Sequence, residues 1–233
     1  RIEVKGQFPR TGSNQFIGRE VVSYAAERDL VPDGGAPLTM GIDVARFGDD
    51  ESVFRFRRGR DARSIKPMRF RGKDTMALAT EAATAIERLK PDAVFVDGGG
   101  VGGGVVDRLK MLGYRVIEVQ SGEKARDEEK YLNRRAEMWA EMRDWLVYGA
   151  IDNDEALIDD LTGPEYALHL KGQIKLGSKD SMKKRGLSSP DDGDGLALTF
   201  AEPVSRMDAA TARRLNRTRG ETASSEYDIF TST

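Results

Sequence analysis

The chain contains no cysteine and a single histidine, His169. The absence of cysteine excludes disulfides, a thiol nucleophile, iron–sulfur clusters and cysteine-based zinc sites. One histidine also excludes histidine-rich zinc sites and leaves a single candidate for a Ser/His/Asp arrangement. Any catalytic chemistry must therefore depend on carboxylates, hydroxyls, lysines and arginines. If the protein is an enzyme, we expect it to use hard, oxygen-bound metal ions.

The sequence also lacks a large excess of either charge, and it has no long apolar segment. Lys and Arg total 37 and Asp and Glu total 39 among 233 residues, so the net charge of −2 does not predict a uniformly basic coat for nucleic acid. No run approaches the ~18 apolar residues of a membrane span. The opening RIEVKGQFPR has no apolar segment of a signal peptide. We expect a soluble globular protein with no membrane partner.

Composition along the chain predicts three segments. Residues 1–37 are expected to be an N-terminal linker with one short helix near 19–28, closed by the turn-forming VPDGGAP. Residues 38–203 contain the apolar periodicity of a single domain. Residues 204–233 have little such periodicity and are expected to form a flexible C-terminal tail.

Within the domain, the order of elements predicts an α/β fold with a mixed sheet. Antiparallel strands come first, and a strand–helix–strand unit over 93–120 adds parallel pairing. A β-hairpin and a final helix follow. The expected strands cover 38–45, 52–59 and 64–71, the expected helices follow Asp74 and cover 133–146 and 189–203, and the hairpin covers 166–178.

Several acidic residues occur at positions that this fold would bring close together. Asp43 lies in the first strand, Asp97 ends the strand 93–97, and Asp191, Asp192 and Asp194 lie in the first turn of the last helix. Neighbouring strands are ~4.8 Å apart, and carboxylates that close cannot all stay ionised without cations. Two divalent ions ~3.5–4 Å apart would fit and would suit phosphodiester hydrolysis. Taken singly, each aspartate is equally compatible with an ordinary strand end or helix start.

The glycine run GGGVGGG at 98–104 supports an alternative function. Gly98, Gly100 and Gly103 form G-x-G-x-x-G after a strand, with Glu118 in the next strand, as in a dinucleotide- or nucleotide-binding module. Against it, antiparallel strands precede the unit and Asp97 would lie beside a pyrophosphate. The glycines could equally clear space for a DNA backbone. A third alternative is a non-catalytic docking domain.

A basic cluster near the last helix predicts contact with phosphates. Residues 171–185 carry six basic side chains against one acidic side chain, a local charge of +5 next to the carboxylates. With so few such charges we expect weak, salt-sensitive DNA binding without readable sequence preference. The predicted DNA-binding residues are Lys171, Lys175, Lys179, Lys184 and Arg185.

Three stretches together resemble a known family. GIDVARFGDD, VFVDGGGVGGGVVDRL and IKLGSKDSMKKRGLSSPDDGDGLALTF are similar to the nuclease domain of tailed-bacteriophage large terminase subunits. The opening VKGQFPRTGSNQFI resembles the segment joining the packaging ATPase to that domain, so the similarity covers roughly residues 4–203. The resemblance implies a ribonuclease H-like fold, shared with Holliday-junction resolvases: a mixed five-stranded sheet flanked by helices, with an extra β-hairpin.

The resemblance also implies a function and a set of site residues. It implies a metal-dependent endonuclease that cleaves double-stranded viral DNA, the genome concatemer, by two-metal hydrolysis during packaging. Asp43, Asp97 and Asp194 would be the main ligands of two Mg²⁺ or Mn²⁺ ions, with Asp191 in support. Lys183 would be a basic residue near the scissile phosphate. Gly193 and Gly195 stand where the family usually has alanine, which predicts a weaker start of the last helix.

The implied partners are those of a packaging motor. They are double-stranded DNA, a packaging ATPase domain on the full-length chain, the portal protein and the small terminase subunit, in the cytoplasm of the infected bacterial host. The sequence has no G-x-x-x-x-G-K-[ST] motif, so we do not expect this chain to power packaging by itself.

Overall fold

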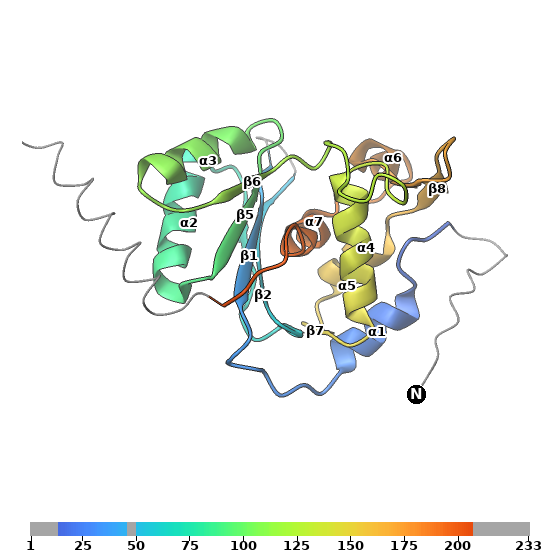
Figure 1. Ribbon diagram of the computed structural model, residues 1–233, viewed down its shortest axis with the longest axis horizontal. Helices are drawn as coiled ribbons and strands as arrows, with labels where there is room; N and C mark the ends of the chain where they lie inside the picture. The colour runs from blue at the N-terminus through green and yellow to red at the C-terminus, as the bar shows by residue number, and fades with distance from the viewer. Residues whose placement is uncertain (1–13, 46–49, 207–233) are drawn as a thin grey trace, which may run out of the picture.

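The computed structural model describes residues 14–45 and 50–206, and these form three layers (Figure 1). A mixed sheet forms the middle layer. Helices α2 (Thr75–Leu89) and α3 (Gly102–Met111) cover one of its faces. The other face carries α1 (Arg19–Glu27), α4 (Arg134–Leu146), α5 (Glu155–Thr162) and α7 (Asp191–Leu198), with the short α6 (Lys179–Lys184) beside them.

The sheet confirms the predicted mixture of parallel and antiparallel pairing. Its order is β6-β5-β1-β2-β3-β7, and β4 also pairs with β2. Strand β1 pairs antiparallel with β2 and parallel with β5, which is parallel to β6. The strands are β1 (Leu38–Asp43), β2 (Ser52–Arg58), β3 (Asp61–Ala62), β4 (Met68–Phe70), β5 (Ala93–Asp97), β6 (Ile117–Val119) and β7 (Ala150–Ile151).

Among the described residues the sheet therefore has seven strands, two more than the five expected. The two extra strands, β3 and β7, are two residues long and pair in parallel with each other at one edge. Segments this short leave no period-two pattern in a sequence. The predicted extra hairpin is present as β8 (Tyr166–Leu168) and β9 (Ile174–Leu176), a separate two-stranded sheet.

Alternation along β1 divides its side chains between two cores. Met40 and Ile42 pack with α2 and α3, and the same cluster takes up Val94 and Val96 of β5. Because successive strand residues point to opposite faces, Gly41 and Asp43 face α7. Helix α2 forms where predicted because the Asp74 side chain accepts from the Ala77 N–H.

Helix α7 lies close against β1 because two glycines meet there. A Cβ atom on Gly41 would lie 2.1 Å from the carbonyl oxygen of Gly195, a contact that real structures do not contain. All residues of α7 are buried, and its helical span begins at Asp191. The weaker helix start that Gly193 and Gly195 predicted is therefore offset by packing against the sheet.

The division of the chain into linker, domain and tail stays a prediction. From the first segment, Phe16, Ile17 and Val22 are buried in the same core as α4, α5 and α7, and Gln15 bridges to Glu165 beside the hairpin. The tail from residue 207 onward lies outside the described residues. No helix in the part of the chain that the structure describes is long and apolar enough to cross a membrane.

Candidate metal centre at the ends of strands β1 and β5

The sheet brings Asp43 and Asp97 to one edge. Ile42 pairs with Val96 in the parallel ladder, so the next residues of both strands lie side by side on the face that carries α7. Asp43 is buried and Asp97 is half-buried. Open α/β sheets place their ligand sites at this carboxyl end of the strands. The structure thus brings together the two strand aspartates that the sequence singled out.

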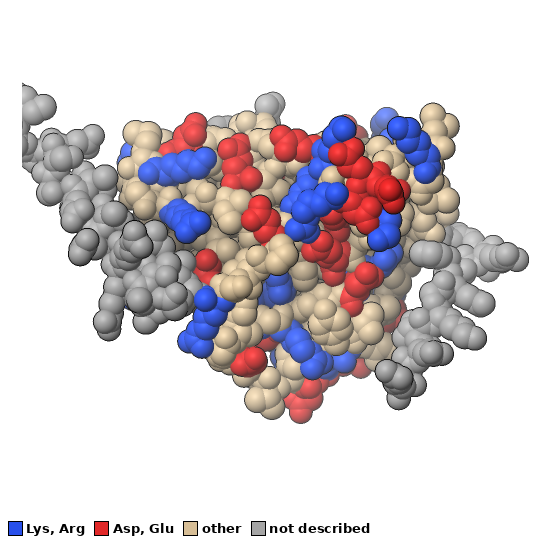
Figure 2. All heavy atoms as spheres, viewed as in Figure 1, with Lys and Arg blue, Asp and Glu red and all other residues tan. Residues whose placement is uncertain are grey.

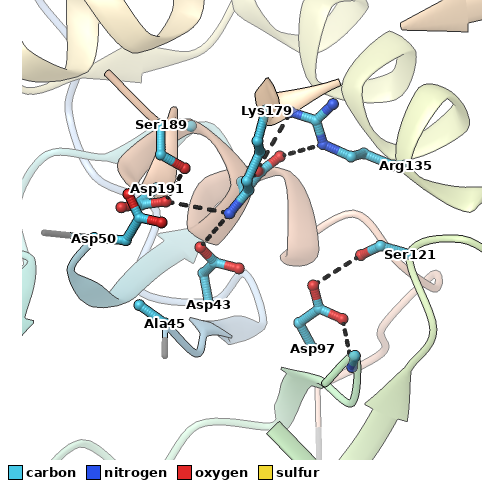
Figure 3. A network of polar contacts seen from close by, with 12 residues as sticks. Asp43, Ala45, Asp50, Asp97, Ser121, Arg135, Lys179, Ser189 and Asp191 are labelled. Carbon is cyan, nitrogen blue, oxygen red and sulfur yellow. Dashed lines mark hydrogen bonds and ion pairs between the residues drawn. The ribbon is translucent and has the colours of Figure 1, made fainter. Parts of the chain in front are cut away.

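Helix α7 adds two carboxylates to the same place. Asp191 and Asp194 are three residues apart, so they share one face of the helix. Both are buried. Figure 3 shows Asp43 and Asp191 on either side of one lysine ammonium, that of Lys179, the first residue of α6.

Lys179 is the residue around which the aspartates gather. Its Nζ lies 3.1 Å from Asp43 Oδ2, 3.1 Å from Asp191 Oδ1 and 3.2 Å from Asp194 Oδ2 (Figure 3). The Ser178 side chain caps α6 by accepting from the Ser181 N–H, which fixes the start of this short helix. The sequence placed Lys179 among the DNA-contacting residues, whereas here it contacts the carboxylates.

Burial and neighbouring charges shift the pKa values within this cluster. Burial raises the pKa of Asp43 to about 7; Lys179 opposes this, and the carboxylates of Asp194, Asp191 and Asp97 reinforce it. Burial alone would also raise the pKa of Asp194, but Arg135 and Lys179 hold it below its usual value.

Asp97 is held by groups of its own. Its Oδ1 accepts from the Gly99 N–H at 3.0 Å, and its Oδ2 accepts from the Ser121 hydroxyl at 3.1 Å (Figure 3). Ser121 follows strand β6, the neighbour of β5. Sequence reasoning had no basis for selecting one serine among many, because the contact depends on the β5–β6 pairing.

Asp194 is held by α4. Arg135 donates from Nε to Oδ1 at 2.8 Å and from Nη2 to Oδ2 at 3.3 Å, and the Trp139 indole donates to Oδ1 at 2.7 Å. Arg135 and Trp139 are four residues apart and so share one helix face. Arg135 also donates to the Gly177 carbonyl, just before α6. Neither residue was predicted to belong to the site, because the contacts depend on the packing of α4 against α7.

Asp191 and Asp192 have different surroundings. Asp191 accepts from Lys179, from the Ser189 hydroxyl at 2.6 Å and from the Glu51 N–H at 3.0 Å. Asp192 instead accepts from Arg55 Nε at 2.6 Å and Arg69 Nε at 2.7 Å. Asp191 therefore belongs to the carboxylate cluster, and Asp192 links α7 to the sheet.

The other predicted basic residues lie outside the cluster. Lys183, on the same helix as Lys179, pairs with Asp50 at 2.9 Å. Arg185 pairs with Glu165 at 3.0 Å, while Lys171, Lys175 and Lys184 are exposed. On the face shown in Figure 2, basic and acidic side chains lie intermixed. This face shows no continuous basic surface.

The carboxylates of Asp43, Asp191 and Asp194 are suitable ligands for a hard divalent cation, although the ammonium of Lys179 lies between them. Among the described residues, no three acidic or histidine side chains form a group arranged to hold a metal ion as they stand. The reason is that one ammonium lies between the oxygens of Asp43, Asp191 and Asp194. Buried carboxylate oxygens sharing one cation are the ligands that Mg²⁺ and Mn²⁺ prefer, so the residues fit such an ion once the ammonium moves.

Some glycines of the run 98–104 lie tightly against the chain itself, whereas a Cβ on Gly103 would meet nothing closer than 3.8 Å. A Cβ on Gly98 would lie 2.4 Å from Glu118 Oε1, and one on Gly102 would lie 1.8 Å from the Asp97 carbonyl oxygen. Gly100 has φ +61°, which favours glycine. Local packing thus accounts for these three glycines, and no further observation favours a dinucleotide.

Comparison with known proteins gives one curated relative. No family model matches the chain. A protein of Enterobacteria phage P7 described as a probable terminase, large subunit, is 26% identical over 209 residues, which cover 83% of this chain and 42% of the relative. The chain thus spans less than half the length of that protein.

Solved structures share the architecture. The nuclease domain of the large terminase subunit gp2 of bacterial virus Sf6 superposes with a TM-score of 0.71 at 19% identity, covering 83% of this chain and all of that domain. The predicted resemblance to terminase nuclease domains is confirmed. The large terminase nuclease of thermophilic phage G20c, solved with bound magnesium, gives a TM-score of 0.55 at 17% identity over 73% of this chain and 84% of that one. The chain has the ribonuclease H-like fold of these domains.

Proposed function

We propose that this chain is a metal-dependent endonuclease domain that cleaves double-stranded DNA, the viral genome concatemer, during phage DNA packaging. One observation carries the proposal: buried carboxylates from β1 and α7 converge on a single cation at the carboxyl end of the sheet. The relation to a probable terminase large subunit supports it. So does the likeness in fold to a terminase nuclease solved with magnesium.

In this proposal four aspartates hold two divalent ions, Mg²⁺ or Mn²⁺. They are Asp43, Asp97, Asp191 and Asp194. When bound, such ions supply an activated water and stabilise the leaving oxygen of a phosphodiester. The chain's own groups orient the carboxylates: Ser121 and the Gly99 N–H hold Asp97, while Arg135 and Trp139 hold Asp194.

Lys179 gives this site a resident counter-ion. Its ammonium must leave the carboxylate oxygens before a metal ion can contact them, because both cations would occupy the same space. The lysine stem is on α6, the helix whose other end carries Lys183 and Lys184. We therefore expect DNA and metal binding to be linked through the position of this helix.

The DNA would contact the exposed basic residues around the hairpin and α6. Lys171, Lys175 and Lys184 are exposed. Lys183 and Arg185 pair with single carboxylates at the surface, an arrangement that a phosphate could replace. We keep Lys183 as the candidate for a contact near the scissile phosphate. Few phosphate contacts predict weak affinity that falls steeply with salt.

The partners and location follow the same proposal. A packaging ATPase domain would lie on the full-length chain, and the portal protein and small terminase subunit would join the motor in the cytoplasm of the infected bacterial host. The experiment is a pull-down in which this chain is immobilised and each purified partner is passed over it. If the chain retains none of the partners, the nuclease proposal loses its packaging role.

Cleavage of supercoiled plasmid tests the enzymatic proposal. The chain is incubated with Mg²⁺, Mn²⁺ or EDTA, beside Asp43→Asn, Asp97→Asn and the matched control Asp107→Asn, whose side chain is exposed on α3. We expect metal-dependent nicking and linearisation that both site variants lose and the control keeps. No cleavage by a folded wild-type chain in any metal would favour a docking domain instead. Cleavage by both site variants would place the activity elsewhere.

A further inference from the structure

Helix α7, which carries Asp191 and Asp194, has no cap of its own. Its N-cap position is Pro190, and no side chain at that position accepts a hydrogen bond. The first intrahelical bond runs from the Asp194 N–H to the Pro190 carbonyl at 2.7 Å. The backbone N–H groups of the helical residues before Asp194 therefore need acceptors from another part of the chain.

Asp160 of α5 provides that acceptor. Its Oδ2 accepts from the Asp192 N–H at 2.9 Å and from the Gly193 N–H at 3.3 Å. These are the second and third helical residues, whose N–H groups an N-cap side chain ordinarily binds. Asp160 is only 8% exposed. A buried carboxylate from a different helix thus replaces the missing cap.

The contact is built into the packing around it. A Cβ on Gly193 would lie 2.8 Å from the Trp139 ring, which would have to shift, and 3.5 Å from Asp160 Cβ, an ordinary contact distance. Trp139 is also the residue that donates to Asp194. The glycine that the family resemblance marked as a departure lets Asp160 and Trp139 approach the start of the helix.

We propose that Asp160 is a positioning residue for the metal centre. By capping α7 from α5 it fixes where the helix begins and how it is rotated, and hence where Asp191 and Asp194 point relative to Asp43. This rests on the proposed function, since the aspartates are positioned for metal. Groups that orient metal ligands in this indirect way typically change metal affinity or activity by about 10- to 100-fold when they are removed.

The test compares Asp160→Ala, Asp160→Asn and the control Asp159→Ala with the wild-type chain. Asparagine keeps an oxygen that can accept both N–H groups, whereas alanine keeps none. The Asp159 side chain, on the same helix, is 71% exposed and lies 3.7 Å from the guanidinium of Arg19. Three quantities are measured for each variant. They are the Mn²⁺ affinity by titration calorimetry, the rate of plasmid cleavage at saturating Mn²⁺, and the rate of hydrogen–deuterium exchange over residues 191–198.

We expect the Mn²⁺ affinity of Asp160→Ala to be at least about 10-fold lower than that of wild type. Its backbone amides in α7 should exchange hydrogen faster, at temperatures well below the melting temperature of the variant. Asp160→Asn should stay within about threefold of wild type because it keeps the acceptor. Asp159→Ala should not change. This rescue by the conservative variant separates positioning from a general loss of stability.

Two results would overturn the proposal. One is a folded Asp160→Ala with wild-type Mn²⁺ affinity and wild-type exchange over α7. The other is an Asp160→Asn as impaired in Mn²⁺ binding as alanine, and this variant decides the question if the alanine variant does not fold. A wild-type chain that neither binds Mn²⁺ nor cleaves DNA would instead overturn the proposed function, and the exchange measurement would still decide the capping.

Discussion

The ammonium of Lys179 lies 3.1 Å from the carboxylate of Asp43, which is buried at the end of the central strand. A lysine in this position neutralises charges that would otherwise repel one another in a poorly hydrated site. It also occupies the space that a divalent ion would need. The carboxylates of this site thus already share one cation, and in the proposed function metal binding would exchange that cation for another.

The first prediction concerns removal of this lysine. Lys179→Ala leaves Asp43, Asp191 and Asp194 without their shared cation, so the metal-free protein should lose stability, by about 1–3 kcal/mol because the lysine side chain is 38% exposed and solvent screens its charge. Added Mn²⁺ should raise the melting temperature of this variant more than that of wild type, because binding stabilises the folded state. Thermal unfolding in EDTA and in Mn²⁺ measures both effects.

Lys183→Ala is the matched control for this prediction. It removes a lysine from the same helix, but one that pairs with Asp50 at the surface, where an ion pair contributes only about 0–1 kcal/mol. If Lys179→Ala in EDTA melted at the wild-type temperature, the lysine would not be the counter-ion of the cluster.

The second prediction concerns pH. The pKa of Asp43 is raised to about 7, above the ordinary value of 3.8, chiefly by burial, so the folded state holds a proton that the unfolded state releases. The corresponding stabilisation is present at low pH and is lost as the pH rises through about 7. Metal binding should change in the opposite direction, because the ion must displace that proton.

Two titrations check this prediction. The metal-free free energy of unfolding should fall between pH 5 and pH 8, and Asp43→Asn should remove part of that slope; burial also raises the pKa of Asp160, to about 8, so Asp160 contributes to the same slope. Over the same range the Mn²⁺ affinity of wild type should rise, by about tenfold per pH unit below the pKa if one proton is released. A slope that is the same in wild type and in the Asp43→Asn variant would mean that another group titrates.

The third prediction concerns Arg55, whose guanidinium is buried between two carboxylates. It donates to Asp192 at 2.6 Å and to Asp152 at 2.7 Å, joining β2 to α7. Arg55→Ala removes the guanidinium from the buried Asp152 and leaves Asp192 with Arg69 alone, and it should cost about 3–5 kcal/mol. Arg71→Ala, at an exposed pair with Glu51, should cost at most about 1 kcal/mol. Urea unfolding of both variants measures the difference, and equal midpoints would contradict the prediction.

The parts of the fold that could be predicted were those with a local signal. Alternation placed β1, a capping aspartate placed the start of α2, and the strand end placed Asp97 at the edge of the sheet where Asp43 also lies. The mixture of pairing followed from the antiparallel pair that precedes a parallel unit. The two-residue edge strands had no such pattern.

The missing parts of the site depend on contacts between distant segments. Lys179 was grouped with the DNA-contacting lysines because a charge run does not show which member turns inward. Arg135 and Ser121 are recognisable only when α4 faces α7 and β6 lies beside β5. Asp160 carries no recognisable sequence signal, because capping across helices leaves no trace at a fixed spacing.

The last prediction concerns the contact of Gly41 with Gly195. A methyl group at residue 41 would lie 2.1 Å from a backbone oxygen, so α7 must move away from β1 in Gly41→Ala. Overpacking of this kind costs about 1–3 kcal/mol, and the shift would also carry Asp191 and Asp194 away from Asp43. We expect lower stability together with weaker Mn²⁺ binding, measured by urea unfolding and calorimetry. Gly34→Ala is the control, because nothing lies within 4 Å of a Cβ there. Wild-type stability and Mn²⁺ affinity in Gly41→Ala would show that the packing of α7 on β1 does not set the geometry of the site.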